Sequence, residues 1–147
     1  MKWLLPPTLW ILTILAMVAI MLMSPPMAFY PAWLRWLGIA IFPAGLALNI
    51  MAARQFHIAK TNIKTFNDPK VLVTTGLFAR SRNPMYLGFC ISLLGAALLT
   101  NNVKNTVIVF LFFATCHFWY VPFEEAAAEK QFGDAYLDYK KRVRRWI

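Results

Sequence analysis

Four apolar runs occupy most of this 147-residue chain and limit what it can fold into. They cover residues 4–23, 33–53, 85–99 and 106–123. A helix needs roughly 20 apolar residues to cross a bilayer, so the run 85–99 spans it only by beginning within the preceding segment. Because lipid offers the backbone no hydrogen-bond partners, such runs cross as helices. We therefore predict an all-α fold, a polytopic membrane helix bundle with about four transmembrane helices, in a single domain of residues 1–147.

The composition supports the same class of protein. Hydrophobic residues make up 60% of the chain, and the formal net charge is +9. A basic, aromatic-rich and mostly apolar chain is more typical of membrane proteins than of nucleic-acid-binding proteins, so we expect a lipid bilayer as partner and no nucleic acid. Lys2 gives the first run the positive start of a signal peptide, but its apolar core is too long and no small-residue cleavage site follows. We interpret this run as a span.

The basic residues predict the orientation. They gather in the connection 54–84 and in the C-terminal segment 124–146. The first turn carries no charge, and the turn between the last two runs carries only Lys104. With four spans, both basic segments lie on one side, which the positive-inside rule makes cytoplasmic. We therefore expect a multi-pass protein of a bacterial inner membrane with both termini in the cytoplasm.

The segment 124–146 predicts an amphipathic C-terminal helix. Its large apolar residues recur three and four positions apart, which places them on one helical face. Gly133 lies within this pattern and is expected to interrupt the helix. The residues on the face are Phe132, Tyr136, Tyr139, Val143 and Trp146.

The two cysteines, Cys90 and Cys116, both lie inside apolar runs. Neither belongs to a CxxC motif or to a Cys/His spacing, so we expect no metal site and no disulfide framework. We interpret both as small buried hydrophobic residues.

One chemically informative stretch, residues 76–88, leads into the third run. Gly76 permits a tight turn, and Pro84 suits the first turn of a helix. A helix N-terminus with Arg80 and Arg82 beside it can bind an anionic group. The alternative is that these arginines contact lipid headgroups.

The second stretch is the adjacent pair Glu124 and Glu125, where the fourth run ends. On a helix these carboxylates point about 100° apart, so one can face inward. An inward carboxylate needs a partner that is cationic or donates hydrogen bonds. Arg80 or Arg82 could serve, as could a ligand carrying an ammonium group or hydroxyls. Acidic residues also suit the N-terminus of the following helix.

Residues 72–88, the pair Glu124–Glu125 and residues 132–143 together resemble the isoprenylcysteine carboxyl methyltransferase and phospholipid methyltransferase superfamily. The resemblance covers roughly residues 70–143 and implies an integral membrane enzyme with S-adenosylmethionine as cofactor. This sequence has Asn83 where many members have His, so that side chain donates a hydrogen bond but does not titrate. Tyr120 lies in the region where eukaryotic members place an Arg for the substrate carboxylate.

The resemblance also implies site residues. Candidate catalytic residues that line the site are Tyr136, Tyr139 and Arg142. The residues expected to face the cofactor are Lys70, Val71, Leu72, Val73, Phe78, Asn83, Pro84, Met85, Tyr86 and Glu124.

The expected function is transfer of a methyl group to a small or lipid-like acceptor, through a carboxylate, amine or thiol, at the cytoplasmic face. No two of the six glycines lie two positions apart, so the glycine-rich loop of a Rossmann domain is absent. Alternatives are an NADPH-dependent membrane reductase of related fold and a non-catalytic protein that retains the fold. A proton-coupled transporter needs an acid within a span, and the first three runs contain none.

Several residues within or near the runs carry weaker expectations. Pro43 and Gly45 should kink the second span. Asn49 is expected to hydrogen-bond another helix. His117 is either a satisfied bundle histidine or part of the acceptor path. A basic cluster near the C-terminus is most simply a contact with anionic lipid; it comprises Lys140, Lys141, Arg142, Arg144 and Arg145.

Overall fold

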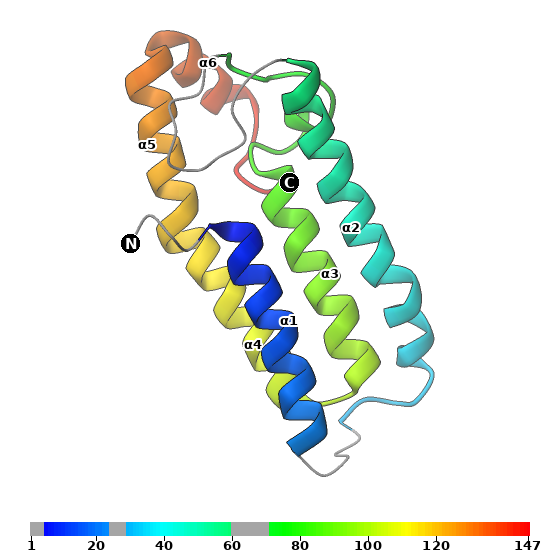
Figure 1. Ribbon diagram of the computed structural model, residues 1–147. Helices are drawn as coiled ribbons and strands as arrows, with labels where there is room; N and C mark the ends of the chain where they lie inside the picture. The colour runs from blue at the N-terminus through cyan, green and yellow to red at the C-terminus, as the bar shows by residue number, and fades with distance from the viewer. Residues whose placement is uncertain (1–4, 24–28, 60–70) are drawn as a thin grey trace.

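The computed structural model describes residues 5–23, 29–59 and 71–147, and in these ranges every regular element is helical (Figure 1). The prediction of an all-α bundle is confirmed. In chain order the elements are α1 (Pro6–Met23), α2 (Leu34–Ile58), the 3-10 turn η1 (Gly76–Ala79), α3 (Pro84–Thr100), α4 (Val103–Thr115), the π-helical turn η2 (Cys116–Tyr120), α5 (Val121–Phe132) and α6 (Asp134–Arg142).

Three helical stretches are long and apolar enough to cross a membrane. They are α1, α2 and the uninterrupted run Val103–Phe132, which joins α4, η2 and α5. Helix α3 is apolar but has only 17 residues, in line with the short third run of the sequence. The chain is therefore a membrane protein built as a helix bundle.

The C-terminal part differs from the predicted single helix over 124–146. The fourth helix continues past Glu124 to Phe132, and α6 is a separate nine-residue helix. The segment after the two glutamates contains three alanines, a glutamate and a lysine, all good helix formers, so nothing stops the helix there. It stops at Gly133, which has a φ of 52° and interrupts the pattern as predicted.

Glycines bring α2 and α3 into direct backbone contact along their length. A Cβ at Gly45 would lie 2.3 Å from the Ser92 backbone nitrogen, and one at Gly88 would lie 2.7 Å from the Gly45 carbonyl oxygen. Small residues allow this close approach in membrane bundles, where packing rather than the hydrophobic effect joins the helices. Helix α2 runs without a break through Pro43.

Polar side chains add hydrogen bonds between the helices. The Asn49 side-chain amide of α2 donates to the Met85 carbonyl of α3 at 3.0 Å, which confirms the expectation for Asn49. The Trp10 indole of α1 donates to the Ser92 hydroxyl of α3 at 2.9 Å. Between α1, α3 and α4 lies an apolar core that includes Cys116, which is fully buried as predicted. Side-chain hydrogen bonds therefore help to hold α1, and they include the Asn105 amide of α4, which donates to the Met17 carbonyl of α1 at 3.2 Å.

Candidate functional site

The loop that precedes α3 and the C-terminal segment meet at one end of the bundle (Figure 1). The Tyr139 hydroxyl of α6 donates to the Phe78 carbonyl at 2.6 Å. The Arg82 backbone amide donates to the Arg144 carbonyl at 3.0 Å. The loop before α3 and the C-terminal segment that follows the two glutamates are therefore neighbours in space.

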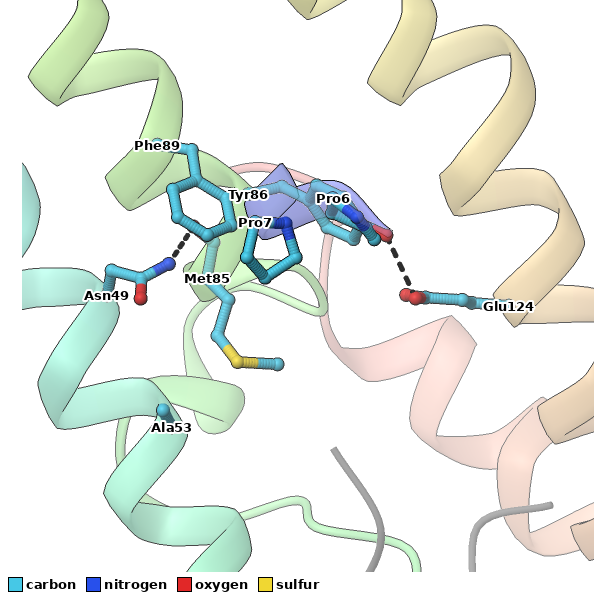
Figure 2. Close-up of a pocket in the computed structure, with 8 residues that line it drawn as sticks. All are labelled: Pro6, Pro7, Asn49, Ala53, Met85, Tyr86, Phe89 and Glu124. Carbon is cyan, nitrogen blue, oxygen red and sulfur yellow. Dashed lines mark hydrogen bonds between the residues drawn. The ribbon is translucent and has the colours of Figure 1, made fainter. Parts of the chain in front are cut away.

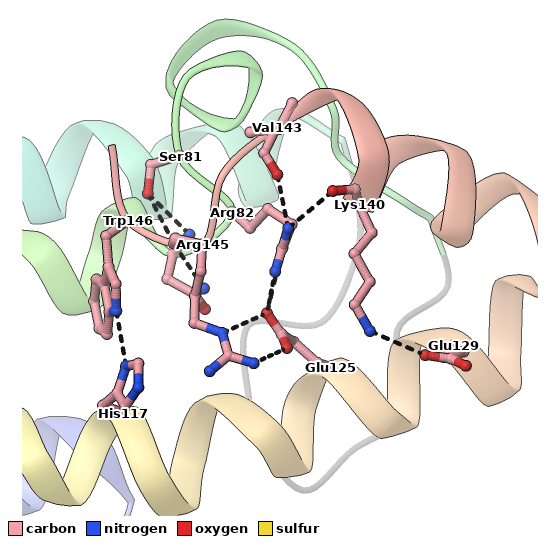
Figure 3. Close-up of polar contacts among 10 residues, drawn as sticks. Ser81, Arg82, His117, Glu125, Glu129, Lys140, Val143, Arg145 and Trp146 are labelled. Atoms are coloured by element: carbon pink, nitrogen blue, oxygen red, sulfur yellow. Dashed lines mark hydrogen bonds and ion pairs between the residues drawn. The ribbon is translucent and has the colours of Figure 1, made fainter.

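Glu125 lies at the centre of an ion cluster, which we define as Arg82, Glu125 and Arg145 (Figure 3). The residue is 8% exposed, and its carboxylate accepts from the Arg82 guanidinium at 2.8 and 3.3 Å. It also accepts from the Arg145 guanidinium at 2.6 and 3.1 Å. The sequence offered Arg80, Arg82 or a ligand as partner for an inward carboxylate. In the structure Glu125 pairs with Arg82 and also with Arg145.

The π-helical turn η2 sets the orientation of both glutamates. Pro122 has no backbone N–H, so a regular α-helix would lose a hydrogen bond and acquire a clash there. The chain instead widens just before it, and the Val121 amide donates to the Cys116 carbonyl five residues back. One extra residue in a turn shifts the facing of all later residues by about 100°. Glu124 and Glu125 consequently face the bundle.

Glu124 lines a hollow between the first turn of α3 and α5 (Figure 2). The Tyr86 hydroxyl donates to its carboxylate at 2.9 Å. The hollow has a volume of about 490 Å³, including its open mouth. The residues that line it are Pro6, Pro7, Asn49, Ala53, Met85, Tyr86, Phe89 and Glu124.

The structure brings three of the predicted cofactor-facing residues into this hollow, namely Met85, Tyr86 and Glu124. Pro84 adjoins them as the first residue of α3. The side-chain amide of Asn83 is used elsewhere, because it donates to the Arg145 carbonyl at 3.0 Å.

The other predicted cofactor-facing residues precede η1 or lie within it. Phe78 is buried and packs edge-on against Phe56 with ring centroids 5.0 Å apart. Leu72 packs against the tyrosines of α6, Val73 is half-buried and Val71 is exposed. Lys70 lies outside the described residues.

Sequence reasoning missed five of the residues that line the hollow. Asn49 and Ala53 are one helical turn apart on α2, and Phe89 follows Met85 by one turn on α3, so each pair shares a face. A polar Asn in an apolar run was the available signal for this part of α2. The residues that α1 contributes to the hollow, Pro6 and Pro7, carry no comparable signal in the sequence. They approach the other helices only through tertiary packing.

Among the three predicted catalytic residues, the structure gives two a structural contact. Tyr139 is hydrogen-bonded to the Phe78 carbonyl, and Arg142 is exposed with its Nε donating to the Asp138 carbonyl at 3.3 Å. Tyr136 is buried, and burial together with the charge of Glu125 raises its pKa to about 12. A phenol with this pKa stays protonated at neutral pH. None of the three is among the residues that line the hollow.

Replacing Tyr139 with Phe is expected to destabilise the protein by about 1–3 kcal/mol, because the buried Phe78 carbonyl loses its donor. Equilibrium unfolding in detergent micelles, followed by circular dichroism, measures this difference. Lys141→Ala is the control, because the exposed Lys141–Asp138 ion pair should contribute less than about 1 kcal/mol. Equal stability of Tyr139→Phe and the parent protein would contradict the structural role of this hydroxyl.

Comparison with known proteins gives a consistent result over much of the chain. A family model described as phospholipid methyltransferase matches residues 33–135. Protein-S-isoprenylcysteine O-methyltransferase of Schizosaccharomyces pombe is 36% identical over 77 residues, which cover 52% of this chain and 33% of that protein.

Two plant proteins align over longer stretches. Protein-S-isoprenylcysteine O-methyltransferase A of Arabidopsis thaliana is 34% identical over 102 residues, covering 66% of this chain and 48% of that protein. Form B from the same plant is 30% identical over 120 residues, covering 76% of this chain and 57% of that protein. The chain therefore spans between about a third and somewhat more than half of the length of these relatives. No solved structure matches the chain with statistical significance.

Proposed function

Because this chain belongs to the phospholipid methyltransferase family, we propose that it is an integral membrane methyltransferase that uses S-adenosylmethionine. The acceptor is small or lipid-like, receives the methyl group on a carboxylate, amine or thiol, and is bound at the cytoplasmic face. The relatives named protein-S-isoprenylcysteine O-methyltransferase support chemistry of the isoprenylcysteine carboxyl methyltransferase type. The observation that carries the proposal is the hydrogen bond between Tyr86 and Glu124 inside the hollow, because it joins the two stretches that carry the resemblance.

The residues of the hollow suit the proposed cofactor. S-adenosylmethionine carries an ammonium group, ribose hydroxyls and an apolar ring. The Glu124 carboxylate and the Tyr86 hydroxyl would hold its polar groups, and Met85, Ala53 and Phe89 would contact its apolar parts.

When bound, the cofactor supplies a methyl group on a positively charged sulfur, which needs little covalent help to react. The protein's part is to bind both reactants, align them and exclude water. Tyr86 is fixed by its hydrogen bond to Glu124 and by stacking on Tyr120, with ring centroids 6.2 Å apart. Pro6 and Pro7 of α1 complete the lining of the hollow.

The distribution of basic residues supports a cytoplasmic site. Arg80 is exposed and lies directly after η1, in the loop that contacts the C-terminal segment. The C-terminal segment adds further exposed cations there, and the positive-inside rule places such clusters in the cytoplasm. These cations are Lys140, Lys141, Arg142 and Arg144.

Calorimetric titration of the detergent-purified protein with S-adenosylmethionine and S-adenosylhomocysteine tests the proposal. We expect saturable binding that Glu124→Gln weakens about tenfold or more, because hydrogen bonds to a carboxylate are worth about 1.5–3 kcal/mol. Glu129→Gln is the matched control, since Glu129 is exposed on the same helix, and should bind as the parent does.

Two results would count against the proposal. Equal affinity of the Glu124→Gln and Glu129→Gln variants would place the cofactor outside the hollow. A well-folded parent that binds neither ligand would reject S-adenosylmethionine as cofactor. A parallel titration with NADPH would then separate a reductase from a protein without this chemistry.

A further inference from the structure

The last five residues, 143–147, form a C-terminal tail that returns from α6 to the loop before α3. Val143 is extended, with φ −120° and ψ 131°, so the chain leaves the helix there. The Trp146 indole donates to His117 Nδ1 at 3.0 Å and packs on Phe113 with ring centroids 5.0 Å apart. His117 is thus a satisfied bundle histidine. The tail lies beyond residues 33–135, the part that matches the family, so its contacts are additional to that segment.

Arg145 differs from the other basic residues near the C-terminus. From the sequence we expected Arg145, like its four basic neighbours, to contact anionic lipid. In the structure Lys140, Lys141, Arg142 and Arg144 are exposed. The Arg145 side chain instead turns inward and forms two hydrogen bonds with the buried Glu125 carboxylate.

Arg145 also contacts the segment that leads into α3, through its backbone. Its carbonyl accepts from the Asn83 side-chain amide at 3.0 Å and from the Ser81 hydroxyl at 3.4 Å. One residue therefore holds α5 with its side chain and the start of α3 with its carbonyl. Glu125 adjoins Glu124, and Asn83 lies three residues before Tyr86.

From this arrangement we propose that Arg145 is a positioning residue for the hollow. It sets the separation of the Tyr86 hydroxyl and the Glu124 carboxylate without touching either of them. The inference rests on the proposed function, because it assigns Arg145 a role in cofactor affinity. The contact is strong, because two parallel N–H donors of a guanidinium fit a carboxylate and the Glu125 side chain is only 9% exposed.

The test uses four variants and two measurements on each. Arg145→Gln removes the charge, Arg145→Lys keeps the charge without the paired donors, and Arg144→Gln is the matched control at an exposed neighbour. Hydrogen exchange of the segment 81–87, which contains the Arg82 amide, reports on the contact without any ligand. Titration with S-adenosylhomocysteine reports on the hollow. Tyr30→Phe, which loses a hydrogen bond to Thr106 at the opposite end of the bundle, controls for general loss of stability.

We expect Arg145→Gln to accelerate exchange in 81–87 and to weaken S-adenosylhomocysteine binding about tenfold. Arg145→Lys should recover part of both properties, whereas Arg144→Gln and Tyr30→Phe should retain parent affinity. Parent-like exchange and affinity in Arg145→Gln would overturn the proposal, as would an equal loss of affinity in Tyr30→Phe. If Arg145→Gln does not fold, Arg145→Lys decides, and parent-like behaviour in both measurements overturns the proposal. A parent without affinity for the ligand would reject the proposed function. Parent-like exchange in Arg145→Gln would still separately reject the role of Arg145 in positioning α3.

Discussion

Glu125→Gln is expected to lower the free energy of unfolding by about 3–5 kcal/mol, because removing one member of a buried ion cluster leaves the other charges uncompensated. The Glu125 and Arg82 side chains are each only 9% exposed, so solvent replaces little of the lost interaction. The amide of Gln can accept a hydrogen bond but carries no charge to balance Arg82 and Arg145. Equilibrium unfolding in detergent, followed by circular dichroism, measures the loss.

Glu129→Gln provides the comparison for this prediction. Glu129 also forms an ion pair, with Lys140 at 3.5 Å, but its side chain is 46% exposed. Loss of this ion pair should lower the free energy of unfolding by less than about 1 kcal/mol, because exposed pairs are screened by water. Similar losses in the two glutamine variants would mean that Glu125 is not balanced by the two arginines. Because Glu125→Gln is expected to unfold easily, it is a poor control for cofactor binding.

Gly45→Leu is expected to destabilise the bundle by at least about 3 kcal/mol, at or above the upper end of typical overpacking effects. The obstacle is the backbone of α3, since a Cβ at this position would lie 2.3 Å from the Ser92 nitrogen. Backbone atoms cannot move aside as the end of a flexible side chain can, so α2 and α3 would have to separate. Unfolding in detergent and the elution volume on gel filtration report the loss of packing.

The matched control is Ala47→Leu, which adds a leucine at an exposed position two residues further along α2. That side chain would meet lipid, so we expect a change of less than about 0.5 kcal/mol. A tolerated Gly45→Leu would show that the two helices are further apart than the structure places them.

Local patterns in the sequence predicted much of the fold. The apolar runs predicted the helices of the bundle, and Gly133 predicted the break before the last helix. The Asn49 side chain was expected to hydrogen-bond another helix, because the interior of the bundle has a low dielectric constant. Each of these depends on the chemistry of a residue and its immediate neighbours. The two acidic residues were also recognisable, because carboxylates at the end of an apolar run need partners.

Long-range contacts could not be predicted in the same way. Arg145 pairs with a glutamate 20 positions earlier, and its sequence context is the same as that of four exposed neighbours. The continuation of the fourth helix depends on the wider turn before Pro122, for which helical periodicity gives no signal. Pro6 and Pro7 reach the hollow because α1 packs on α3, which the composition of α1 does not reveal.

The return of the tail to α3 has a consequence for the order in which the molecule is completed. The long apolar helices are all synthesised before Arg145, so Glu125 and Arg82 are present in the chain before their third partner is. The ends of α3 and α5 can take up their final spacing only once the tail has been synthesised and has folded back. A chain truncated after residue 142 should therefore retain its membrane helices and yet lack an assembled site.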